Sequence, residues 1–248
     1  MVHTVRERSG SRGRTFLRNT MKRSEINQYI REAESFFAQN HFILPPFASW
    51  SLKDFQSRKR EEIAEILDCE LGWDVTDYGA GKYLEKGLFL FTIRNGKLGS
   101  QLYTKPYAEK IMISKENQVT PLHYHRSKTE DIINRGGGRL VFELYNSDPN
   151  DGLLQTPVTV WSDGVKMTVP AGKPFSLPSG ASLTLPVGVY HSFYGEKGSG
   201  QVMIGEVSAV NDDHTDNVFY EKLPRYPEIQ EDEEPYRLLV TDYAKFLR

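Results

Sequence analysis

The chain has 248 residues, with 31 Lys and Arg against 33 Asp and Glu, so its formal net charge is −2. This length suits one large domain with additions, and the balanced charge predicts no nucleic-acid partner. No apolar run approaches the roughly 18 residues of a membrane helix, so we expect no membrane partner. The only cysteine, Cys69, excludes an intramolecular disulfide and fits a reducing cytoplasm.

The first twenty residues differ in composition from the rest of the chain. They are rich in Ser and Gly and contain five arginines: Arg6, Arg8, Arg12, Arg14 and Arg18. They lack the apolar stretch of about 7–15 residues that a secretory signal needs. Met21 and the residues after it resemble a natural beginning. We therefore expect residues 1–20 to form a poorly ordered extension.

Residues 21–85 are expected to form a helical segment that packs on the remainder of the chain. Ser24 can cap a first helix. The apolar face of that helix consists of Ile26, Ile30, Ala33 and Phe37, which recur at helical spacing. Residues 58–67 favour a second helix, and residues 73–81 are expected to be a loop.

Residues 86–248 show a different pattern, in which short strands alternate with turn residues. Asn95-Gly96 is a strong hairpin signal, and the turn at residues 162–164 joins two further strands. Roughly ten short strands at regular spacing predict a mainly β fold, either a sandwich or a jelly-roll barrel, with a C-terminal tail.

A histidine cluster suggests a metal site within this region. His123 and His125 are separated by one residue, so in a strand both imidazoles point to the same face. Glu130 follows five residues later and can curl back toward them. A His-x-His pair alone is more often a surface pair, but His191 lies in a glycine- and proline-rich turn and offers a fourth ligand. Three imidazoles and one carboxylate suit Mn, Fe, Zn, Co or Ni.

These residues resemble the two motifs of the cupin superfamily. The first, H-x-H-x4-E-x6-G, comprises His123, His125, Glu130 and Gly137, and the second, G-x5-P-x-G-x2-H, comprises Gly180, Pro186, Gly188 and His191. Two positions depart from the motifs, Asn117 where glycine is usual and Gly195 where asparagine is usual. The resemblance implies a cupin-type jelly-roll β-barrel over residues 86–248 with a divalent metal on the four ligands. It also implies a homodimer, because dimers are common among cupins.

Charged residues that interrupt apolar strands are candidates for catalysis. Glu206 stands in an otherwise apolar run, and either Glu109 or Lys110 must face the same side of its strand as the alternate residues. Asp213 lies in an acidic loop that could close over the barrel mouth. Strand edges often carry such charges for solubility alone, and a solvated loop would look the same. Glu143 and Arg225 are weaker candidates.

Longer runs resemble the cupin-type D-lyxose isomerases. They cover residues 109–112, 117–125, 130–138, 205–208, 211–213 and 216–217. The resemblance implies an aldose–ketose isomerase with bound Mn²⁺ that acts on the monosaccharides D-lyxose and D-xylulose, with D-mannose and D-fructose as related substrates. Glu206 would move the proton between C1 and C2, Lys110 would shuttle the hydroxyl proton or stabilise the oxyanion, and Asp213 would bind distal hydroxyls.

Three alternatives remain open at this point. A metal-assisted hydride shift would use the same ligands with less need for Glu206. A cupin oxygenase would require iron and consume oxygen. A non-catalytic sugar-binding cupin would bind sugar without turnover.

Overall fold

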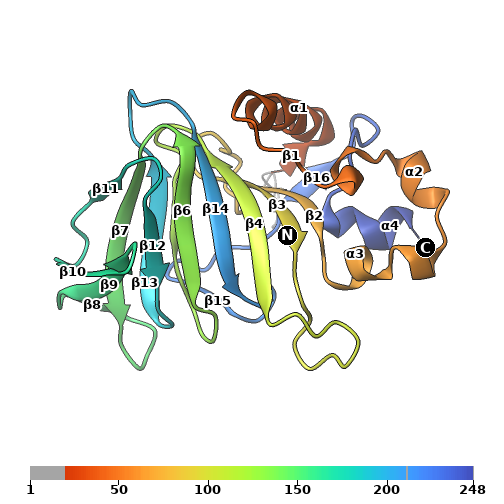
Figure 1. Ribbon diagram of the computed structural model, residues 1–248. Helices are drawn as coiled ribbons and strands as arrows, with labels where there is room; N and C mark the ends of the chain where they lie inside the picture. Colours follow the sequence, from red (N-terminus) through yellow and green to blue (C-terminus); the bar gives the residue numbers. More distant parts are fainter. Residues whose placement is uncertain (1–19, 211, 248) are drawn as a thin grey trace, which may run out of the picture.

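The computed structural model describes residues 20–210 and 212–247 (Figure 1). The expected extension at residues 1–20 therefore lies, apart from Thr20, outside the described residues. Strands dominate the remainder, in two sheets that curl toward each other, so the expected mainly β jelly-roll fold with an N-terminal helical segment is confirmed. Among the described residues, no helix is long and apolar enough to cross a membrane.

Two sheets make up the barrel in the described part of the chain. The larger has eight strands in the order β10 (Val165–Val169), β9 (Val158–Ser162), β12 (Ser182–Leu185), β6 (Glu130–Gly137), β14 (Val202–Ala209), β4 (Tyr107–Ser114), β3 (Leu88–Arg94) and β2 (Gly72–Thr76). The smaller has the order β11 (Phe175–Leu177), β7 (Leu140–Ser147), β13 (Val189–Gly195), β5 (Thr120–His125) and β15 (Asn217–Phe219), with β8 (Leu153–Leu154) paired to β7.

Helical elements flank the β2 side of the larger sheet (Figure 1). They are α1 (Arg23–Gln39), η1 (Pro46–Ser49), α2 (Leu52–Gln56), η2 (Arg60–Glu62), α3 (Ala64–Asp68), η3 (Val240–Asp242) and α4 (Tyr243–Phe246). The expected apolar face of α1 is buried, and it packs in one cluster with Trp73, Phe89 and Phe91 on the outer side of the larger sheet. Beside it, β1 (Thr20–Lys22) pairs in parallel with β16 (Glu228–Gln230).

Three local expectations differ from the structure. Ser24 does not cap the first helix, because α1 already begins at Arg23, and the Ser24 hydroxyl donates to Asp232 instead. The helix expected over residues 58–67 is divided into η2 and α3. The loop expected over residues 73–81 is wrong for its first four residues, which lie in β2 at the edge of the larger sheet. Every residue of β2 is buried, including Asp74, whose partner Arg225 is 151 residues away in the sequence. The alternation of apolar and polar residues that identifies a strand is therefore not visible in the sequence of β2, because both faces of this edge strand are covered.

The apolar core between the two sheets gives way to a polar cavity along β14. The inward side chains of this strand begin with Val202 and Ile204, which lie in the core, and continue with Glu206 and Ser208. On the neighbouring strand β4, Lys110 is the direct partner of Glu206. The side chains that face the interior of the barrel thus change from apolar to charged along these strands.

The two departures from the cupin motifs have local explanations. Asn117 has a φ of +56°, a left-handed conformation that asparagine tolerates better than most residues other than glycine. At Gly195, a Cβ atom would lie 2.8 Å from the carbonyl oxygen of Lys115, so the close approach of these two segments requires glycine.

Candidate active site

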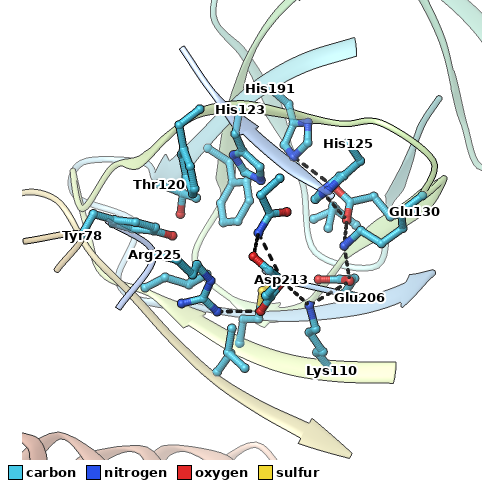
Figure 2. Close-up of a pocket in the computed structure, with 18 residues that line it drawn as sticks. Tyr78, Lys110, Thr120, His123, His125, Glu130, His191, Glu206, Asp213 and Arg225 are labelled. Atoms are coloured by element: carbon cyan, nitrogen blue, oxygen red, sulfur yellow. Dashed lines mark hydrogen bonds and ion pairs between the residues drawn. The ribbon is translucent and has the colours of Figure 1, made fainter. Parts of the chain in front are cut away.

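The candidate active site is a cavity between the two sheets (Figure 2). All seven of the stronger candidates from the sequence line it: Lys110, His123, His125, Glu130, His191, Glu206 and Asp213. They come from both sheets and from the loop after β14. Apolar side chains, among them Leu90, Met112 and Phe219, complete the wall. Glu143 is not among the lining residues.

Three buried imidazoles converge in this cavity. One ring nitrogen of each of His123, His125 and His191 lies within 4.8 Å of those of the other two. His123 Nδ1 lies 2.8 Å from the carbonyl oxygen of Pro121, and His191 Nδ1 lies 3.1 Å from that of Val189. Since a carbonyl can only accept, Nδ1 of each ring carries a proton, which leaves Nε2 as the atom of each ring that can act as a metal ligand. Burial and the neighbouring imidazoles hold the pKa of His123 well below its ordinary value, so this ring is neutral.

Glu130 joins the imidazoles to form a set of four donors. Its Oε2 lies 3.3 Å from His125 Nε2, and its Oε1 lies 3.1 Å from His191 Nε2. Oε1 and His191 Nε2 are both buried, yet neither has a hydrogen-bond partner among the described residues. A carboxylate oxygen and an imidazole nitrogen this close, each without a hydrogen-bond partner among the described residues, fit a shared cation. The donor set suits a divalent transition metal, although it does not identify one.

Asp216 completes the surroundings of His125, and it was not identified from the sequence as a site residue. Its Oδ2 lies 3.3 Å from His125 Nδ1, and its Oδ1 accepts hydrogen bonds from the backbone nitrogen and hydroxyl of Ser127 at 2.8 and 2.6 Å. Burial raises its pKa, but the interaction with His125 and the hydrogen bonds from Ser127 outweigh burial and place the pKa below its ordinary value. A carboxylate behind a ligating imidazole is typical of metal centres.

Lys128 is the second residue that the sequence reasoning missed. It is buried, and its Nζ lies 2.8 Å from Glu130 Oε2 and 2.9 Å from Glu206 Oε1. Burial lowers its pKa, but the two carboxylates outweigh this effect and raise the pKa above its ordinary value. One signal was present, since this charged residue stands between His125 and Glu130.

Glu206 is the central carboxylate of the opposite wall. Its Oε1 accepts hydrogen bonds from Lys128 Nζ at 2.9 Å and Ser208 Oγ at 3.1 Å, and it lies 3.4 Å from Lys110 Nζ. Burial raises its pKa, but the two lysines outweigh burial and hold the pKa below its ordinary value. Glu206 is therefore ionised at neutral pH. The structure also decides between neighbours on β4, because Lys110 faces inward whereas Glu109 pairs with Arg94 at 3.2 Å.

Asp213 extends the charged wall away from the imidazoles. Its Oδ1 lies 3.8 Å from Lys110 Nζ, and its Oδ2 accepts a hydrogen bond from Arg225 Nη2 at 2.8 Å. Arg225 also donates to the buried Asp74 of β2. The cavity thus has one wall of alternating charges that runs from Glu130 to Arg225, as Figure 2 shows.

Comparisons with known proteins identify relatives over nearly the whole chain. The family model described as D-lyxose isomerase matches residues 21–243. A D-lyxose/D-mannose isomerase from Serratia proteamaculans is 49% identical over 227 residues, which are 92% of this chain and 100% of that protein. One from Escherichia coli O157:H7 is 46% identical over 226 residues, 91% of this chain and 100% of that protein.

Solved structures resemble the fold at much lower identity. An L-ribose isomerase from Cellulomonas parahominis, with no ligand, has a TM-score of 0.58 and 16% identity, covering 86% of this chain and 100% of that one. An L-ribose isomerase from Acinetobacter sp. DL28, in complex with L-ribose, has a TM-score of 0.57 and 15% identity, covering 86% and 99%. At these identities the likeness supports the barrel fold alone.

Proposed function

The chain belongs to the D-lyxose isomerase family, and from this membership we propose that it interconverts D-lyxose with D-xylulose and D-mannose with D-fructose. The relatives of 49% and 46% identity carry the proposal, because both are D-lyxose/D-mannose isomerases that the chain covers completely. An ionised carboxylate, Glu206, in the same cavity as the imidazole cluster fits an isomerase better than an oxygenase or a binding protein.

We propose that His123, His125, Glu130 and His191 hold a divalent ion, with Mn²⁺ as the metal by resemblance to the family. The support from the site is the orphaned pair of Glu130 Oε1 and His191 Nε2. When bound, the ion would supply Lewis acidity to two adjacent oxygens of the sugar.

Glu206 is the proposed base that moves the proton between C1 and C2. It is ionised and buried in the cavity that the imidazoles also line, and Ser208 fixes its orientation. Lys110 is the proposed partner of the substrate oxygens. A sugar oxygen that draws Lys110 away weakens the ion pair at Glu206 and raises the pKa of that carboxylate, which strengthens it as a base. Asp213 would accept hydrogen bonds from hydroxyls further along the sugar.

The first test is turnover by the metal-stripped protein before and after Mn²⁺ is restored. We expect interconversion of D-lyxose and D-xylulose in both directions only with metal, and the same for D-mannose and D-fructose. Glu206→Gln should lower kcat by about 10²- to 10⁴-fold, the usual contribution of a general base.

Glu143→Gln is the matched control, because it neutralises a carboxylate on a barrel strand that does not line the cavity. It should retain activity. Metal-dependent turnover that survives Glu206→Gln would instead favour a hydride shift, and no turnover with metal bound would reject the substrate assignment.

A homodimer in the cytoplasm completes the proposal. The dimer follows from the resemblance to cupins, and the compartment fits a single buried thiol, Cys69. Sedimentation of the purified protein would reject the dimer if the mass were that of one chain.

A further inference from the structure

A β-bulge in β5 changes the direction of one side chain next to the imidazoles. His123 pairs with His191 on β13, and Thr120 pairs with Phe193. Two steps along β13 thus correspond to three steps along β5. In a regular strand Thr120 and His123 would face opposite sides of the sheet, because their spacing is odd. The extra residue turns Thr120 to the cavity side, as bulges do near active sites.

The hydroxyl of Thr120 has no partner at its new position. Thr120 lines the cavity, and its Oγ1 is buried without a hydrogen bond to any described residue. The same holds for Nη1 of Arg225. Figure 2 shows Thr120, Tyr78 and Arg225 at the end of the cavity away from Glu130 and Glu206. Buried polar atoms are almost always paired, so these two orphans at one end of the cavity indicate a ligand that supplies the partner.

The chemistry of this end suits the remote carbons of a sugar. The ring of Tyr78 lies 5.6 Å from that of Phe219, which in turn lies 5.4 Å from that of His123. These rings form an aromatic wall that runs from the imidazoles toward the end of the cavity where Tyr78 and Arg225 lie. A sugar whose reacting carbons lie beside His123 would place C–H groups on the aromatic wall and its last hydroxyls near Thr120 and Arg225.

We propose that Thr120 and Arg225 form a subsite for the hydroxyls on the carbons furthest from the reacting pair, and that Thr120 helps to determine specificity. The proposal rests on the sugar isomerase function given above. It assigns Thr120 to substrate binding and not to proton transfer. Removal of the Thr120 hydroxyl should therefore change KM and leave kcat nearly unchanged.

The test compares Thr120→Val with Thr120→Ser in the metal-loaded enzyme. Valine keeps the shape and removes the hydroxyl, whereas serine keeps the hydroxyl. We expect Thr120→Val to raise the KM for D-lyxose about 5- to 10-fold, the effect of one neutral hydrogen bond, with kcat within about 2-fold. Thr120→Ser should restore most of the affinity. Thermal melting of both variants checks that the fold is retained.

Deoxy sugars then test whether the hydroxyls meet. The inhibition constants of 4-deoxy- and 5-deoxy-D-lyxose are measured against D-lyxose turnover, with the wild type and with Thr120→Val. Removal of a sugar hydroxyl and removal of the Thr120 hydroxyl are then the two changes of a double-mutant cycle. For one of the two sugars, loss of the hydroxyl should weaken binding to the wild type but not to the valine variant. Additive losses for both sugars, or equal behaviour of the serine and valine variants, would overturn the subsite.

The two proposals fail in different ways. Absence of wild-type turnover on all four sugars would overturn the isomerase function and the subsite with it. Normal wild-type turnover with no coupling in the cycle would overturn the subsite alone.

Discussion

Asp216 is not a proposed metal ligand, but it controls the tautomer and the ring orientation of His125, which is one. His125 lies between two carboxylates, with Glu130 3.3 Å from Nε2 and Asp216 3.3 Å from Nδ1. Burial lowers the pKa of His125, but Glu130 outweighs burial and the pKa is raised. A ligating Nε2 must present its lone pair, so the remaining proton belongs on Nδ1, facing Asp216. The carboxylate of Asp216 thereby selects the tautomer and the ring orientation that binding requires.

We predict that Asp216→Asn lowers the affinity for Mn²⁺ about 10- to 100-fold, because the imidazole loses its anionic partner. Equilibrium dialysis of the metal-stripped protein measures this affinity without an activity assay. Asp212→Asn is the control, since Asp212 lies in the same loop and bonds to His214 and Thr215 instead. An equal loss in both variants would show that the loop as a whole, and not Asp216, supports the site.

The loop between β14 and β15 connects the cavity with the surface. On its inner side Asp213 reaches Lys110 and Arg225. On its outer side His214 Nε2 lies 3.0 Å from Glu70 Oε1, and its ring lies 5.7 Å from that of Tyr226. Successive residues thus anchor one loop at two different places. A change in the outer anchor is therefore expected to alter how firmly the inner carboxylate is held.

The pH dependence of this anchor can be predicted. The hydrogen bond to Glu70 outweighs partial burial and raises the pKa of His214 above 6.5. An imidazole whose pKa is raised by folding contributes its full stabilisation of the folded protein at pH values below its pKa in the unfolded chain. This stabilisation is lost as the pH rises through the pKa of the folded state. Both side chains are largely exposed, so the pair is worth at most about 1 kcal/mol. Glu70→Gln should lower Tm at pH 6 and leave it unchanged at pH 9.

Glu85→Gln provides the control for this pH series. Glu85 pairs with Lys82 on the surface, so this ion pair contains no imidazole. Its effect on Tm should be the same at both pH values. A Glu70→Gln effect that is equally independent of pH would contradict the His214 assignment.

Arg23 ties the two ends of the described chain together on the outside of the barrel. It is fully buried near the start of α1, with Nε 2.8 Å from Glu231 Oε2 and Nη2 2.7 Å from Asp242 Oδ1. Burial lowers its pKa, but these carboxylates outweigh burial and raise it. The parallel pairing of β1 with β16 joins the same two segments beside α1 (Figure 1). The flanking segments therefore depend on one buried ion cluster.

We predict that Arg23→Met destabilises the protein by about 3–5 kcal/mol, because two carboxylates lose their buried partner. Chemical denaturation measures the change. The KM for D-lyxose should stay within about 2-fold for the folded enzyme, since the cavity lies between the sheets. Arg31→Met is the control, because Arg31 is exposed over the ring of Tyr236. A loss of stability no larger than that of Arg31→Met would argue against the cluster.

Local patterns in the sequence were enough to predict a mainly β fold and to select the four candidate ligands. Strand alternation and turn residues are local patterns, so the two imidazoles of the first motif could be placed on one face before any pairing was known. The same reasoning placed α1 by its apolar face. Glu206 was visible because a carboxylate in an apolar strand is costly without a partner.

The contacts between residues far apart in the chain could not be predicted in this way, because they depend on how the strands and loops pack. Lys128 reaches Glu206 across 78 positions, and Asp74 reaches Arg225 across 151. The side of the sheet to which Thr120 points depends on how β5 pairs with β13. One extra residue in a strand moves the side chains beyond it to the opposite face of the sheet. Local periodicity reports which residues share a face, whereas the pairing of strands determines what that face meets.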